Sequence, residues 1–177
     1  MTTLNGVIQT PAIDSQVTLG LLGTEDSLAY RVHEIEDHLH SVGHFYGKDP
    51  GDNFLLENGH TPWVLTAGAS EAFGAWVQLS DGDEITDPEY DPHLTTVYAV
   101  SNANTTYIIQ YGVGDGTVLG TTVVGATWFK SSATLRGAPE EVQARRINNT
   151  DKLWARCNSA ADGATISIGL GLHTYPG

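Results

Sequence analysis

The chain has 177 residues, a pI near 4.6 and a formal net charge of −13, and the charge is unevenly distributed. Residues 1–129 hold 17 of the 21 acids but only two of the eight bases, whereas residues 130–177 hold four acids and six bases. Binding to nucleic acid or to an anionic membrane needs clustered Lys and Arg, so we expect neither as a partner. The 40 % hydrophobic fraction suffices for one core.

Cys157 is the only cysteine, which excludes an intramolecular disulfide and a zinc site built from cysteines of one chain. Residues 1–16 lack the basic start and the apolar run of a signal peptide. No stretch approaches the about 18 consecutive apolar residues of a membrane span. We therefore expect the protein to fold in a cytoplasm.

Residues 1–23 are polar and rich in Gly and Thr, with scattered aliphatic side chains that follow no helical period. Two interpretations are open: a flexible tail, or an extended arm whose apolar side chains dock on a partner. In the second interpretation, the contact residues of the arm are Leu4, Val7, Ile8, Ile13, Val17, Leu19 and Leu21.

The sequence predicts one helix, from Thr24 to His44, and we take residues 24–46 as a helical stem. Thr24 suits the N-cap, and Glu25 and Asp26 suit the positive end of the helix dipole. Apolar side chains recur in alternating steps of four and three, which indicates a heptad seam over about two repeats. The seam either packs on its own domain or associates with copies of itself. Its residues are Leu28, Val32, Ile35 and Leu39, continuing to Val42.

Residues 47–177 are predicted to form a β-sandwich, jelly-roll-like, so the whole chain is mainly β with an N-terminal arm and one α-helix ahead of the sandwich. Residues 47–62 are expected to be a loop. Turn signals at 102–104 and 162–163 each predict a tight hairpin. In the last strand, apolar residues alternate strictly with small or polar ones, as expected for one face on a core. Strands are expected at 63–66, 73–79, 95–101, 105–111, 117–129, 142–148, 152–158 and 164–174.

Four histidines lie between His33 and His44 on the predicted helix. Imidazoles at helical spacing can bind zinc or nickel. The His-Glu-x-x-His pattern is not met, however, and the His38-Leu39-His40 sequence resembles a cupin pair that belongs on a strand. We expect a solvated polar face with histidine–acid pairs, and no metal site.

Two further segments attract attention. Asp81–Pro92 holds six acids in twelve residues and offers oxygen ligands for calcium, but the EF-hand order is not met, so we expect an exposed acidic loop. Gly112–Gly116 lies between two predicted strands and is expected to be a loop, not a dinucleotide site. Cys157 is expected to be buried. The sequence therefore predicts no catalytic residues, no cofactor and no enzymatic activity.

Three segments carry a resemblance to a known group of proteins. They are Ser27–His40, continuing through residues 44–47; Pro62–Gly68 with Phe73–Leu79; and Lys152–Cys157 with Ile166–Gly177. Their layout resembles small structural proteins of tailed-bacteriophage virions, including capsid decoration or cement proteins. The resemblance implies a non-enzymatic protein, made in the bacterial cytoplasm, that bridges capsomers on the outside of the shell. It also implies the major capsid protein as partner, and a homotrimer.

Two other functions stay open at this stage. Similar modules occur in head fibres and tail parts, and a receptor- or glycan-binding module would use Trp63, Trp76, Trp128 and Trp154 to line a carbohydrate groove. A cupin-like metalloenzyme is the third alternative.

Overall fold

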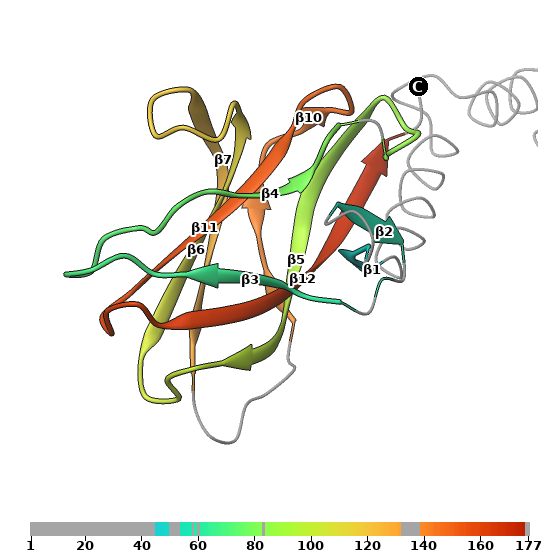
Figure 1. Cartoon of the computed structure of the whole chain (residues 1–177). Helices are drawn as coiled ribbons and strands as arrows, with labels where there is room; N and C mark the ends of the chain where they lie inside the picture. The colour runs from blue at the N-terminus through green and yellow to red at the C-terminus, as the bar shows by residue number, and fades with distance from the viewer. Residues whose placement is uncertain are drawn as a thin grey trace, which may run out of the picture. The chain divides into compact units, whose positions relative to one another are not determined.

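A computed structural model describes residues 45–49, 54–57, 59, 61–82, 84–131 and 139–175. These residues form twelve strands in two antiparallel sheets, which confirms a mainly β, sandwich-like fold (Figure 1). They contain no helix, and so none that could cross a membrane. The predicted arm of residues 1–23 and the heptad seam of the predicted stem lie outside the described residues.

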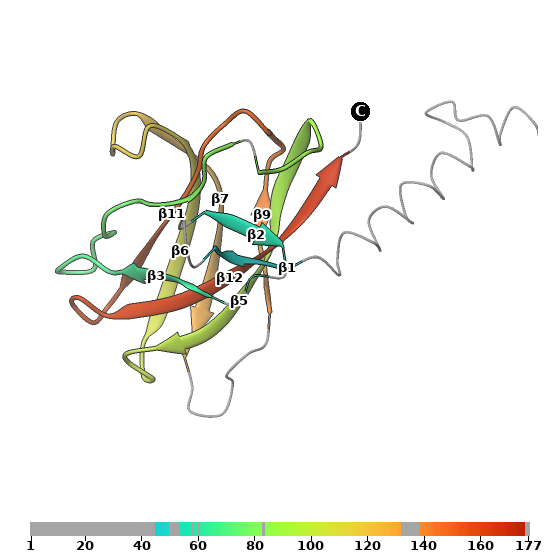
Figure 2. The same ribbon diagram turned by 45° about the vertical axis from the view of Figure 1, so that its right-hand side comes forward.

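The first sheet, sheet A, is built around the long strands β5 (Glu89–Val100) and β12 (Thr165–Tyr175), which form ten residue pairs. On the other side of β12, β3 (Trp63–Thr66) and β1 (Phe45–Lys48) pair with successive stretches of it (Figure 2). β2 (Leu55–Glu57) pairs with β1. The free side of β5 is bordered by β8 (Glu140–Glu141) and β10 (Ile147–Asn148).

The second sheet, sheet B, has the order β4 (Val77–Ser80), β11 (Leu153–Ser159), β6 (Thr106–Gly114), β7 (Thr121–Lys130) and β9 (Gln143–Ala144). Both sheets bury one face in a common core. The predicted alternation of the last strand is confirmed, because its four apolar side chains are all in that core. The largest core side chains are Trp63, Tyr90, Tyr107, Tyr111, Leu65, Leu79, Ile109, Leu153, Ile166, Ile168, Leu170 and Leu172.

Both predicted hairpins are wrong, although the chain does turn at both places. The turn at 102–104 links β5 in sheet A to β6 in sheet B, and the turn at 162–163 links β11 in sheet B to β12 in sheet A. A tight turn reverses the chain, but the residues of the turn do not determine whether the two strands pair or lie in opposite layers. Hairpins form instead between β6 and β7, which pair along their whole length, and between the short strands β1 and β2.

Two short strands of sheet A were not predicted. Phe45 and Tyr46, assigned from the sequence to the end of the helical stem, are the first two residues of β1. β2 lies inside the expected loop at 47–62. Strands of four and three residues are too short for a period-two pattern to be recognised, and Pro50 and Gly51 next to them signal a loop.

Three other strands have shifted bounds. β4 begins at Val77 instead of residue 73, because the segment before it supplies Phe73 and Trp76 to a stack with Arg156. β7 begins at Thr121 instead of residue 117, because Asp115 organises the preceding loop by accepting hydrogen bonds from Thr117 N and Oγ1. β5 begins at Glu89, six residues earlier than the predicted start at 95.

The predicted strand at 142–148 is instead part of a segment that alternates between the two sheets. β8 pairs with β5 in sheet A, β9 pairs with β7 in sheet B, and β10 returns to β5. Val142 lies between β8 and β9, and Ile147 belongs to β10. Both side chains are buried in the core. Residues 140–148 therefore join the β5 side of sheet A to the β7 side of sheet B.

One buried hydrogen bond crosses the core between the sheets, and its removal is a test of the packing. Thr95 Oγ1 on β5 and Tyr111 Oη on β6 are 2.6 Å apart, and both residues are fully buried. We expect Tyr111→Phe to lower the free energy of unfolding by about 1–3 kcal/mol, since it leaves the Thr95 hydroxyl unsatisfied. Urea denaturation measures this. The double variant Tyr111→Phe/Thr95→Val should lose less free energy of unfolding than the sum of the losses in the two single variants. Strictly additive losses would contradict the interaction.

Candidate functional site

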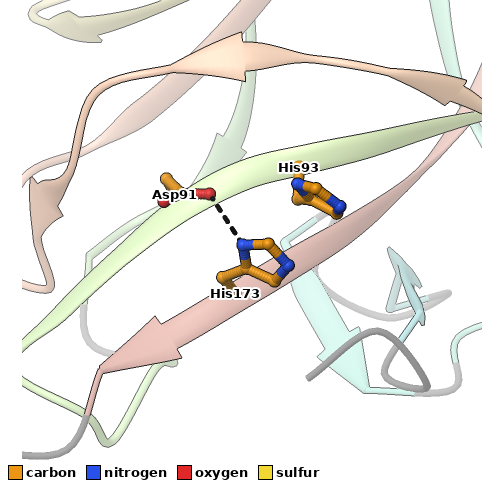
Figure 3. A group of neighbouring side chains, drawn as sticks. All are labelled: Asp91, His93 and His173. Carbon is orange, nitrogen blue, oxygen red and sulfur yellow. Dashed lines mark ion pairs between the residues drawn. The ribbon is translucent and has the colours of Figure 1, made fainter. Parts of the chain in front are cut away.

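The most concentrated set of chemically active side chains in the described chain is a cluster of Asp91, His93 and His173 (Figure 3). One ligand atom from each residue lies within 4.8 Å of the other two. Asp91 Oδ1 and His173 Nδ1 are 3.5 Å apart, and the rings of His93 and His173 stack with centroids 3.7 Å apart. Asp91 and His173 are buried, whereas His93 is half-buried.

The pairing of β5 with β12 builds this cluster. Asp91 and His173 are direct cross-strand partners in the antiparallel ladder. His93 is the extra residue where the register shifts, because Pro92 pairs with Leu172 while Leu94 pairs with Gly171. A bulge of this kind re-aims a side chain, and here it puts His93 on the same side of the sheet as His173. That side faces away from the core, since the adjacent Leu172 points inward.

Neighbouring side chains hold the Asp91 carboxylate in place. Tyr175 donates a hydrogen bond from its hydroxyl to Asp91 Oδ2 at 2.6 Å. Burial, reinforced by Asp91, raises the pKa of Tyr175 to about 12, so the phenol keeps the proton that it donates. The guanidinium of Arg146 lies 3.7 Å over the Tyr175 ring and is also 3.5 Å from the Glu89 carboxylate.

No local sequence pattern predicts this cluster. In the sequence, Asp91 stands out only as one of the oxygen ligands of the acidic segment 81–92, and His93 and His173 belong to no motif. In the sequence, 80 residues separate the two histidines, and only the β5–β12 pairing unites them. The Asp-Pro-His sequence at 91–93 is the one local signal, because a proline inside a strand marks an irregular position.

The expected exposed loop at 81–92 is confirmed only for its first part. Residues 89–92 belong to β5, and Asp91 is buried. The described acids bind separate partners: Asp81 accepts hydrogen bonds from Lys152 and Gln78, and Glu84 accepts one from Ser80 Oγ at 2.6 Å. The hydrogen bond from Lys152 holds the pKa of Asp81 below its ordinary value. These described side chains do not converge as calcium ligands do.

The outer face of sheet B is a second surface of interest. Trp128 is 66 % exposed and pairs across the strands with Ile108, which is also exposed. Beside them, Arg156 donates two hydrogen bonds to Gln110 Oε1, at 3.0 and 2.8 Å, and its guanidinium lies 4.3 Å over the Trp76 ring. Exposed apolar and aromatic side chains beside a held cation are typical of surfaces that bind other molecules.

The four tryptophans do not line one groove. Trp63 belongs to the core between the sheets, and Trp76 is buried beneath Arg156. Trp154 donates from Nε1 to the Gly114 carbonyl at 2.8 Å. Its ring lies over Gly116, whose positive φ of 82° and lack of a side chain make room for it. The prediction that Gly112–Gly116 is a loop is wrong for residues 112–114, which are the end of β6, and the strand after it, β7, begins only at Thr121.

Comparison with known proteins gives no family. No protein-family model matches the sequence, and no curated protein matches it.

Cys157 is buried as predicted, and its chemistry provides a test of the core. Burial raises the pKa of the Cys157 thiol to about 12 from an ordinary value near 9, so it carries almost no thiolate at neutral pH. We expect a disulfide reagent at pH 8 to label the native protein at least about 100-fold more slowly than the urea-unfolded protein. Because the chain has one cysteine, the label reports this site alone. Rapid stoichiometric labelling of the native form would contradict a buried thiol.

Proposed function

We propose that this protein is a non-enzymatic structural component of a bacteriophage virion that decorates and stabilises the outside of the capsid by bridging capsomers. Its partners are the major capsid protein and, in a homotrimer, other copies of itself. The resemblance of the segments at 27–47, 62–79 and 152–177 to virion proteins is what carries the proposal. The sandwich-like fold and the acidic charge of residues 1–129 are consistent with it.

We further propose that the sandwich is a jelly roll, and the strand order supports this assignment. With β8 and β10 counted as one interrupted strand, one sheet runs β3–β12–β5–β8/β10 and the other runs β4–β11–β6–β7. Along the chain, these eight strands change sheet at every connection except β6–β7. Jelly rolls recur in viral capsid proteins and in lectins, so the fold is compatible with decoration and with glycan binding.

In this proposal, the part of the chain before residue 45 makes the contacts and the β body projects outward. Residues 1–23 and the base of the stem lie across capsomers, and the heptad seam joins three stems. The chain enters the body at β1, which is hydrogen-bonded on both sides, to β12 and to β2. The added interface between neighbouring capsomers raises the energy needed to separate them under the pressure of packaged DNA.

A receptor- or glycan-binding head or tail fibre module is the second candidate, favoured by the outer face of sheet B. The indole of Trp128 is largely exposed, and Gln110 and Arg156 beside it offer polar groups. An exposed aromatic ring with neighbouring hydrogen-bonding groups can stack on a sugar and bind its hydroxyls.

Deleting residues 1–23 tests the capsid-contact arm. Purified full-length protein should bind to capsid shells assembled without it, and the truncated protein should bind at least about tenfold more weakly because it loses the arm's apolar contact area. Co-sedimentation with shells measures both affinities, and circular dichroism checks that the β body remains folded.

Equal binding of the two forms would show that the arm is not the contact. If the full-length protein binds no shells but binds glycans, and Trp128→Ala abolishes glycan binding, the second candidate replaces the first.

A single charge in the seam tests self-association. Ile35→Asp should convert a trimer to a monomer, because three buried carboxylates would meet where apolar side chains pack. Light scattering of both forms measures their mass. A wild-type protein that is already monomeric would mean that the seam packs within one chain. Glu36→Asp, which is off the seam and keeps its charge, serves as the matched control.

A further inference from the structure

We infer that Asp91, His93 and His173 form a binding site for one divalent transition-metal ion, with Zn²⁺ the best match. Two imidazoles and one carboxylate are donors that zinc accepts in proteins, whereas calcium and magnesium prefer oxygen ligands alone. The inference rests on the cluster itself and is independent of the proposed place of the protein in a virion.

The spacing of the donor atoms is close to that of a metal site. In a tetrahedral site with bonds of about 2.0–2.1 Å, two ligand atoms lie about 3.4 Å apart. Asp91 Oδ1 and His173 Nδ1 are already 3.5 Å apart. That separation is longer than the about 2.7–2.9 Å of a strong charged hydrogen bond. It matches the distance between two ligand atoms that bind the same metal ion.

The third donor has a short distance to move. The ligand atom of His93 lies within 4.8 Å of the other two, so it must approach them by about 1.4 Å at most to reach tetrahedral spacing. The inference requires His93 to rotate out of its stack on His173, since the in-plane lone pairs of two stacked rings run nearly parallel. His93 is half-buried and stands at a bulge, where the ladder is locally broken. The other two donors are buried on directly paired residues and need no such movement.

Asp91 also has the kind of partner that metal-binding carboxylates have. The Tyr175 hydroxyl binds Oδ2 at 2.6 Å, which leaves Oδ1 as the oxygen that faces His173 (Figure 3). Hydrogen bonds of this kind orient a ligand and tune its affinity for the metal. All four side chains stand on two long, paired strands, a rigid support for a coordination site.

The described residues supply three ligands, which leaves one position of a tetrahedral site to a further donor. Zinc sites with four protein ligands are structural, whereas an open position is the mark of sites that do chemistry or bind a further ligand. The inference therefore gives the outer side of sheet A a binding capacity that the sequence did not predict.

The test is metal binding by the untagged full-length chain. Calorimetric titration with ZnCl₂ should give one equivalent per chain, and CoCl₂ should give the visible bands of a low-symmetry Co²⁺ site that Zn²⁺ then abolishes. His93→Gln should weaken binding by more than about 100-fold, and Tyr175→Phe by about 10- to 100-fold. His93 is the variant of choice because it is the least buried donor, and an unchanged urea midpoint would show that the variant is folded.

A matched control separates this site from the histidines of the predicted helix. A variant with the four histidines between residues 33 and 44 changed to glutamine should keep full affinity for one equivalent of Zn²⁺. The inference is overturned if the wild-type chain binds no Zn²⁺, if His93→Gln binds it as tightly as wild type, or if the four-histidine variant loses the binding instead.

Discussion

The antiparallel pairing of β5 with β12 is the interaction on which the rest of the described body depends. Its ten residue pairs form the centre of sheet A, and every other strand of that sheet except β2 pairs with one of the two. Its inner side supplies Val97 and Ile168 to the core, and also Thr95, which reaches sheet B through Tyr111. Its outer side carries the Asp91–His93–His173 cluster. Loss of this register would remove the core face and the cluster together.

Much of the fold could be predicted from local patterns, and the errors in strand pairing have one physical origin. The alternation around Ile168 and Leu170 identified β12, because a half-buried strand needs a period of two. The turns at 102–104 and 162–163 were identified by residues that bend the chain. The pairing of the strands on either side of these turns could not be predicted in the same way. Pairing depends on which strand faces share a core, and that is determined by segments far away in the sequence. β1 and β2 were missed for a related reason: they are too short to show a period of two, and only their pairing with other strands defines them.

The candidate site was less predictable than the fold for a related reason. The helix histidines at 33–44 drew attention because they are close in sequence, whereas Asp91, His93 and His173 are close only in space. Two features bring them together: a ladder that aligns Asp91 with His173, and a bulge that turns His93 to their side. Neither leaves a periodic signal. A proline at position 92, inside a strand, was the sole trace of the irregularity.

The strands at the ends of the two sheets have a consequence for how copies of this protein tolerate crowding. β2 and β10 end sheet A, β4 and β9 end sheet B, and these strands are only two to four residues long. A long, flat edge strand is a template on which a second chain can add and so begin aggregation. Strands this short also cover little of their neighbours: β9 pairs with only two residues of the ten-residue β7, and β8 and β10 pair with only four of the twelve-residue β5. Within the described residues, the places where a crowded neighbouring copy can add a strand are therefore the uncovered stretches of β5 and β7, and not the end strands themselves.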